Sequence, residues 1–176
     1  MTGMRASLLL PTPLRATSLV SLLSLLSLLS LVSACSSSSS GDAVDASAPA
    51  ALCATDSRAQ TYASGMEQKG SAGTFEIKLL SITPAPAFKG NNAWTIQVVD
   101  TSGAPVSGAT IKVNPFMPDH GHGSSITPQI APGSDPGTYD ITLLNLFMPG
   151  IWTVTIVVTS SSGVSDQSVF TFCIGE

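Results

Sequence analysis

The chain has two histidines, and they stand two residues apart at His120 and His122. They end a stretch that reads Asn-Pro-Phe-Met-Pro-Asp-His-Gly-His-Gly and contains Met117. A second string, Asn-Leu-Phe-Met-Pro-Gly, follows later in the chain and contains Met148. Both strings share the pattern Asn-x-Phe-Met-Pro, and the prolines are expected to stop regular ladder pairing where two strands end. If those strand ends lie close together, two imidazoles and two thioethers converge.

The chemistry that such a group of side chains favours is copper binding. Imidazole binds copper in either oxidation state, and the soft thioether favours Cu(I). Residues two apart on an extended backbone point to the same side, and the adjacent Gly121 and Gly123 allow the backbone to bend around an ion. Asp119 could orient an imidazole. The sequence therefore predicts a partly exposed copper site formed by Met117, His120, His122 and Met148.

The same residues have a purely structural interpretation. The two methionines could fill gaps in a core beneath Pro118 and Pro149, and the histidines could hydrogen-bond loop carbonyls. Phe116 and Trp152 are expected in the core, because aromatic side chains dominate the cores of β-sandwiches. Under this interpretation the chain is a structural or protein-interaction domain that binds no metal.

The paired motifs resemble those of a known family. Met-Pro-x-His-x-His-Gly, then a strand with a tyrosine, then Phe-Met-Pro-Gly-x-Trp is similar to the YtkA-like/FixH-like family of small exported domains. The resemblance covers about Phe75 to Phe172. It implies an immunoglobulin-like fold and, for some members of the family, a part in copper handling or cytochrome oxidase assembly.

Strand patterns recur between turn signals through this part of the chain. Alternating or β-branched runs are separated by glycine and proline turns, such as Ser102 to Pro105 and Pro132 to Gly137. Residues 61–70 could form a short irregular or helical lead-in. About seven strands without a convincing helix predict an all-β, immunoglobulin-like β-sandwich, with a β-barrel as the alternative. The expected strands are residues 74–80, 93–100, 109–113, 125–130 (an edge strand, because it contains proline), 138–143, 151–158 and 166–173.

The N-terminus has the pattern of an export signal. Arg5 and Arg15 precede an apolar run of Ser-Leu-Leu units, which ends in Val-Ser-Ala-Cys at Cys35. This ending resembles the bacterial lipobox, which implies cleavage before Cys35 and a lipid on its sulfur. Ser36 then favours the outer membrane by resemblance to proteobacterial lipoproteins. The expected organisation is a signal peptide at 1–34, a lipidated flexible tether at 35–52 and one domain at 53–176.

Two further cysteines, Cys53 and Cys173, lie at the start and the end of that domain. Outside the cytoplasm two such thiols are expected to form a disulfide. A redox or thiolate metal site is the alternative, although the chain contains no Cys-x-x-Cys.

Composition narrows the classes of partner and activity. Removal of the first 34 residues leaves 5 basic and 11 acidic side chains, a formal charge of −6, which argues against nucleic acid as a partner. Gly-x-Ser-x-Gly, His-Glu-x-x-His and Gly-x-Gly-x-x-Gly motifs are absent from the sequence, so we expect no enzymatic activity. The expected partners are the membrane, through the lipid on Cys35, and a copper ion or an envelope protein.

Overall fold

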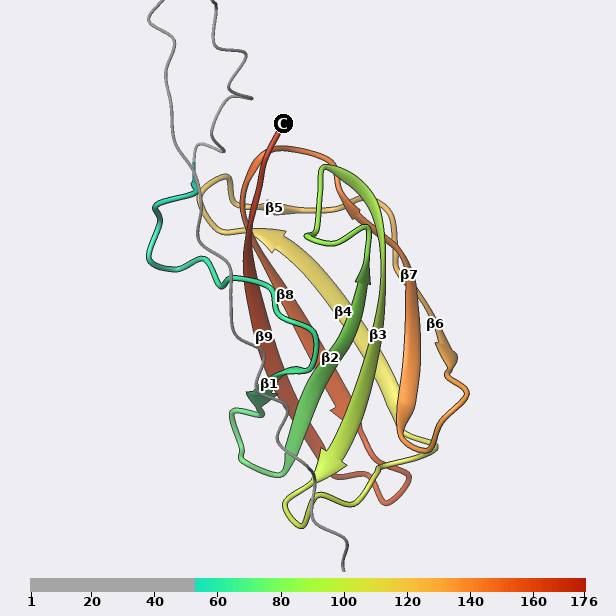
Figure 1. Ribbon diagram of the computed structural model, residues 1–176. Helices are drawn as coiled ribbons and strands as arrows, with labels where there is room; N and C mark the ends of the chain where they lie inside the picture. Colours follow the sequence, from blue (N-terminus) through green and yellow to red (C-terminus); the bar gives the residue numbers. More distant parts are fainter. Residues whose placement is uncertain (1–52) are drawn as a thin grey trace, which may run out of the picture. The chain divides into compact units, whose positions relative to one another are not determined.

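The computed structural model describes residues 53–176. The signal peptide, the lipidation of Cys35 and the tether expected at 35–52 lie outside the described residues. The regular elements of the described part are all β-strands, joined by turns and loops (Figure 1). The strands are β1 (Met66–Lys69), β2 (Phe75–Thr83), β3 (Gly90–Asp100), β4 (Thr110–Met117), β5 (His122–Gly123), β6 (Gln129–Pro132), β7 (Thr138–Leu146), β8 (Gly150–Thr159) and β9 (Ser165–Ile174).

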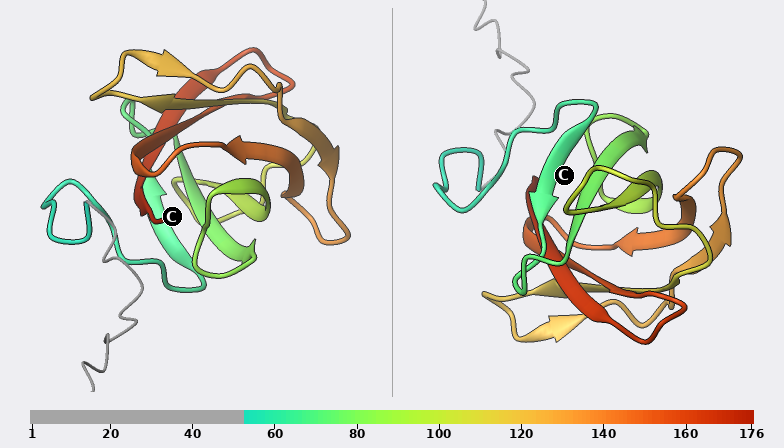
Figure 2. Two further views of the ribbon diagram at one scale, coloured as in Figure 1. Left: turned by 90° about the horizontal axis from the view of Figure 1, so that it is seen from above. Right: turned by 90° about the horizontal axis from the view of Figure 1, so that it is seen from below.

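The strands form two antiparallel sheets that face each other. One sheet has the order β1-β2-β3-β7-β6, and the other has the order β5-β4-β8-β9. The two layers are visible end-on in Figure 2. The prediction of an all-β sandwich is therefore confirmed, and β6 is an edge strand as expected. The strand number differs from the predicted seven because Met66–Lys69 forms β1, where an irregular or helical lead-in was expected, and because the two-residue β5 was not predicted.

The core lies between the sheets and follows from the alternation of apolar residues along the strands. Trp94 on β3 and Phe170 and Phe172 on β9 are all buried. The Trp94 ring meets the other two edge-on, with centroid distances of 6.2 Å to Phe170 and 5.6 Å to Phe172. Such aromatic contacts add to the burial of apolar area that holds the two sheets together.

A buried tyrosine joins the connection between β3 and β4 to β7. The hydroxyl of Tyr139 donates to the carbonyl of Val106 at 2.8 Å and accepts from the amide of Ala109 at 2.8 Å. The predicted turn at 102–105 is present, since the amide of Asp100 donates to the carbonyl of Ala104 at 2.9 Å. The bonds of Tyr139 hold the connection that crosses from one sheet to the other against β7.

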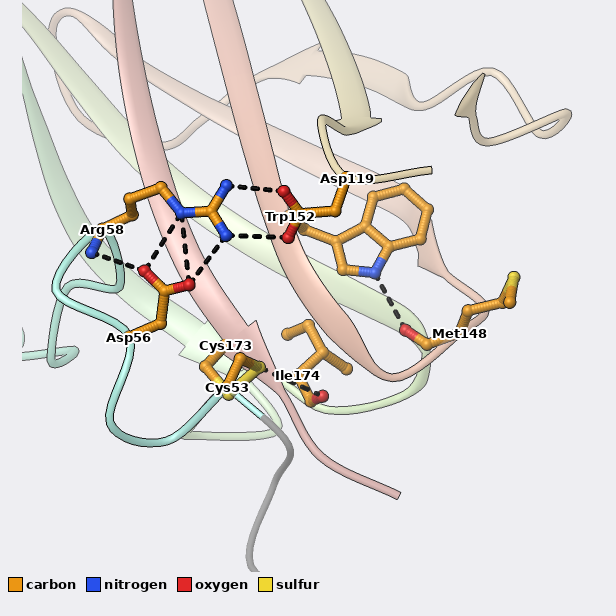
Figure 3. The surroundings of a disulfide bond; sticks show 8 residues. All are labelled: Cys53, Asp56, Arg58, Asp119, Met148, Trp152, Cys173 and Ile174. Atoms are coloured by element: carbon orange, nitrogen blue, oxygen red, sulfur yellow. Dashed lines mark hydrogen bonds and ion pairs between the residues drawn. A yellow bond between two sulfur atoms is a disulfide. The ribbon is translucent and has the colours of Figure 1, made fainter. Parts of the chain in front are cut away.

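Residues 53–65, called the lead-in segment from here on, precede β1 and are joined to β9 by a disulfide. Cys53 and Cys173 are bonded, with 5.4 Å between their Cα atoms (Figure 3). The predicted disulfide is thus confirmed, and the alternative of a thiolate metal site at these cysteines is wrong because both sulfurs are used in the bond. The backbone of Gln60 adds a hydrogen bond of 2.8 Å to the carbonyl of Thr171. Residues 53–176 contain no helical segment with the length and hydropathy of a membrane span.

Candidate functional site

The histidines lie on a tight turn that reverses the chain after β4. The amides of His120 and Gly121 both donate to the carbonyl of Met117, at 3.2 and 2.9 Å. Gly121 has φ of +71°, a left-handed conformation that glycine adopts without steric cost. The turn pairs Met117 directly with His122 on β5. The proline after Met117 ends β4, as the sequence predicted.

The turn brings the two imidazoles together. The ring centroids of His120 and His122 are 5.6 Å apart, with the planes inclined by 65°. The sequence predicted this proximity from an extended backbone, but the actual cause is different, because His120 lies in the turn and only His122 lies in a strand. His120 is exposed and His122 is half-buried.

Aromatic rings surround the imidazole of His122. The ring of Phe147 stacks on it with a centroid distance of 5.5 Å and an interplanar angle of 26°. The buried Trp152 approaches both rings edge-on, at 6.4 Å from His122 and 5.6 Å from Phe147. Trp152 is in the core as predicted, but the place of Phe147 beside the histidine was not predicted. The repeated Phe-Met-Pro string was the available signal, since it marks the two strand ends that meet here.

The two methionines differ in exposure. Met117 is fully buried, whereas Met148 is half-buried at the edge of the core. The methyl end of Met117 lies against Gly150, where an added Cβ would be 2.8 Å from it. The carbonyl of Met148 accepts a hydrogen bond of 2.9 Å from the indole nitrogen of Trp152 (Figure 3). All four predicted ligands therefore lie at one end of the sandwich, but the thioether of Met117 belongs to the core and not to the partly exposed site that was expected.

Phe116 does not occupy the core, so that expectation is wrong. Its side chain is 36% exposed. The reason is the alternation along β4, where Ile111, Pro115 and Met117 point inward. Residues two apart share a face, so Phe116 between the last two must point outward.

Asp119 binds an arginine instead of orienting an imidazole. Its two carboxylate oxygens accept from Nη1 and Nη2 of Arg58, each at 2.7 Å (Figure 3). Arg58 also contacts the carboxylate of Asp56, from Nη2 at 2.7 Å. The hydrogen bonds from Arg58 lower the pKa of Asp119 and bring that of Asp56 to about 2. The bonds keep the lead-in segment attached to the histidine turn, and both carboxylates stay ionised at neutral pH.

The donor set can be tested for its fit to a copper ion. Among residues 53–176, no three His, Cys, Asp or Glu side chains are grouped closely enough to hold a metal. Two imidazoles on one ion, however, need only a suitable spacing. With a metal–nitrogen distance of about 2.0 Å, each ring centre lies about 3.2 Å from the ion, so the two centres lie about 5 to 6.5 Å apart for angles from tetrahedral to linear. The observed 5.6 Å between His120 and His122 falls in this interval.

The architecture and the site define a class: a small two-sheet β domain, with one exposed and one half-buried histidine side by side where β4 turns into β5. Residues 71–157 match the model of the family described as YtkA-like. The chain thus carries a YtkA-like domain, as its motifs indicated.

Comparison with solved structures gives matches of low identity, each with a TM-score below 0.5. A DUF4426 family protein from Pseudomonas aeruginosa PAO1 is 15% identical, with a TM-score of 0.44 over 58% of this chain and 92% of that one. FetP from uropathogenic Escherichia coli strain F11 is 13% identical, with a TM-score of 0.41 over 63% of this chain and 98% of that one. A copper-bound variant of FetP is also 13% identical, with a TM-score of 0.40 over 61% of this chain and 97% of that one. Comparison with curated proteins gives no match.

Proposed function

We propose that this protein is an exported lipoprotein whose YtkA-like domain binds copper through His120, His122 and Met148. The observation that carries the proposal is the spacing of 5.6 Å between the two imidazole rings, which suits a single ion. A thioether next to two imidazoles makes a donor set that Cu(I) prefers, and the imidazoles alone also accept Cu(II).

The two sulfurs have unequal roles in this proposal. Met148 is half-buried and directly follows Phe147, whose ring stacks on His122, so it is the sulfur ligand that we propose. Met117 is fully buried, so it becomes a ligand only if the end of β4 opens. Phe147 and Trp152 would shield one side of His122 from water and limit the orientations of its ring. Copper bound there would supply a soft cation to be stored or handed on, and we propose no catalytic step.

The proposed location follows from the N-terminus. A basic start, an apolar run and the lipobox-like Val-Ser-Ala-Cys support lipidation at Cys35, and Ser36 supports the outer membrane, on its periplasmic side or its surface. A disulfide between Cys53 and Cys173 suits an oxidising compartment. The partners would be the membrane and a copper ion.

Competition titration with Cu(I), and separately with Cu(II), tests the copper proposal. Replacing His120 or His122 by alanine should weaken binding by tenfold or more, because each removes one ligand. Met148→Leu should weaken Cu(I) more than Cu(II), while it keeps the apolar volume. Met66→Leu is the matched control, because Met66 is also partly buried but lies on β1.

The competing function, a metal-free structural or protein-interaction domain, gives a different result. In that case the histidine variants change the midpoint of thermal unfolding without changing copper affinity. Equal copper affinity of the wild type and both histidine variants would end the copper proposal.

The proposed lipidation of Cys35 is tested separately. Mass spectrometry of the mature protein should show an acylated Cys35 as the first residue. A Cys35→Ser variant should be released from the membrane fraction. Normal processing and membrane retention of that variant would contradict the assignment.

A further inference from the structure

Two phenylalanines are exposed in neighbouring loops at one end of the sandwich. Phe88, before β3, is 47% exposed, and Phe147, after β7, is 43% exposed. The loops are adjacent because Gly90 pairs with Leu146 at the end of the ladder between β3 and β7. The ring of Phe88 covers Gly90, with its Cζ 3.6 Å from where a Cβ would be. Single exposed apolar side chains are common in soluble proteins, so the position of this pair is what needs an explanation.

The chain enters the domain at the same end. Cys53 is bonded to Cys173, and Cys173 pairs with Ile151 at the start of β8. Figure 3 shows this disulfide beside the loop that contains Met148, the residue after Phe147. A lipid on Cys35 would be separated from Cys53 by 17 residues. A segment of 17 residues spans at most roughly 60 Å even when it is fully extended. If Cys35 is lipidated, the end with the phenylalanines is the one that the chain connects most directly to the bilayer.

We propose that this end docks on the phospholipid surface, with Phe88 and Phe147 inserted into the interface. The inference rests on the lipidation of Cys35 in the proposed function. A short covalent connection to an anchored lipid would raise the effective concentration of the domain at the membrane, so that even weak insertion by two aromatic rings would contribute to docking. Phenylalanine on the apolar face of a surface-bound element is a common contact with the boundary between headgroups and acyl chains.

The charges at this end suit a zwitterionic surface. Asp56 and Asp119 are paired with Arg58, and Glu176 is paired with Lys89 at 2.6 Å. These five side chains carry two positive and three negative charges, so they give no attraction to anionic lipid. Apolar insertion must therefore supply the binding, and replacing some phosphatidylcholine by phosphatidylglycerol should not strengthen it.

The test uses the mature lipidated protein in phosphatidylcholine vesicles that contain lipids with a spin label on the headgroup. The label should quench the tryptophan fluorescence, because the ring centroid of Trp152 lies 5.6 Å from that of Phe147, which would be inserted in the interface. Phe88→Ser and Phe147→Ser should each reduce quenching at least twofold. Val164→Ser is the matched control, since Val164 is 45% exposed in the turn between β8 and β9, at the far end of those strands. It should leave quenching unchanged.

The outcomes separate this inference from the copper proposal. Phe88 is not among the proposed ligands, so Phe88→Ser should lose quenching while it keeps copper affinity and thermal stability. If Phe147→Ser unfolds the domain, Phe88→Ser alone still decides. Equal quenching in the wild type and Phe88→Ser overturns docking on lipid and leaves the surface for a protein partner. An unacylated Cys35, seen by mass spectrometry of the same sample, overturns both docking and anchoring, whereas loss of the copper result alone leaves docking standing.

Discussion

A buried carboxylate fastens the loop between β1 and β2 to the opposite sheet. Asp166 on β9 is 6% exposed. Its Oδ1 accepts from the amides of Ala72 and Gln167, each at 2.8 Å, and its Oδ2 accepts from those of Thr74 at 2.8 Å and Phe75 at 3.2 Å. Burial acts to raise the pKa of Asp166, but the four N–H donors outweigh it and hold the pKa below its ordinary value.

Asp166→Asn removes half of this acceptor capacity with little change in shape. One oxygen becomes an NH₂ group, which faces amides that are themselves donors. Hydrogen bonds to a charged group contribute about 1.5–3 kcal/mol, and each unsatisfied buried donor costs about 1–3 kcal/mol. Allowing for some relaxation, we expect the free energy of unfolding to fall by about 2–4 kcal/mol. For a domain of this size the thermal midpoint should fall by roughly 10 °C.

Urea unfolding at neutral pH measures the effect, and Asp135→Asn, an exposed carboxylate, is the control. Since the folded-state pKa of Asp166 is lowered, its contribution to stability is present above the unfolded value of about 3.9 and is lost as the pH falls through the folded value. The variant should therefore lose less stability than the wild type between pH 5 and acid pH. A change below about 0.5 kcal/mol at pH 7 would refute this account.

A double-mutant cycle tests the contact itself. A Cβ on Gly70 would clash with the carboxylate of Asp166, so Gly70→Ala must force the two apart. Gly70→Ala should strongly destabilise the wild type and cost much less in an Asp166→Ala background, where the clashing group is gone. Additive effects of the two changes would contradict the contact.

Three further predictions concern a disulfide, a pair of hydrogen bonds and an ion pair that join separate parts of the fold. Replacing Cys53 and Cys173 by serine should lower stability by up to about 4–5 kcal/mol, because the bond closes a loop of 120 residues; urea unfolding with and without reductant checks this, and equal midpoints would contradict it. Tyr139→Phe should cost about 1–3 kcal/mol in the same assay, because two hydrogen bonds of its buried hydroxyl are lost; no loss would contradict that role. Arg58→Gln should speed amide exchange around Asp119 while it leaves the unfolding midpoint nearly unchanged, and unaltered exchange would show that the ion pair does not order the turn.

The strands that sequence reasoning predicted well are those whose pattern is set by the core. The predicted strand at 151–158 lies within β8, because apolar side chains in this run face the core at every second position. The run at 93–100 became most of β3 for the same reason. The two-residue β5 carries no such pattern, since it exists only because the turn at Gly121 folds the chain back onto β4. Short strands of this kind depend on a partner and not on their own composition.

In the candidate site, too, some contacts could be predicted from a sequence pattern and others could not. The meeting of the histidines with the second Phe-Met-Pro string could be inferred, because a repeated proline motif marks two strand ends. The partner of Asp119 could not be inferred, because Arg58 stands 61 residues earlier and no local pattern connects the two. The ion pair depends on the path of the lead-in segment, which the disulfide at Cys53 helps to fix.

The unequal burial of the two methionines could be inferred in part from β4 alone. Ile111 and Pro115 face the core, so Met117, at the same parity, must face it too. Met148 lies after the end of β7, in a loop where no such alternation applies, and it stays half-buried. If copper binds at this end, Met148→Leu should weaken Cu(I) binding more than Met117→Leu, and Met117→Leu should change mainly the packing. Equal losses from the two substitutions would mean that the end of β4 opens on binding and that the core methionine is itself a ligand.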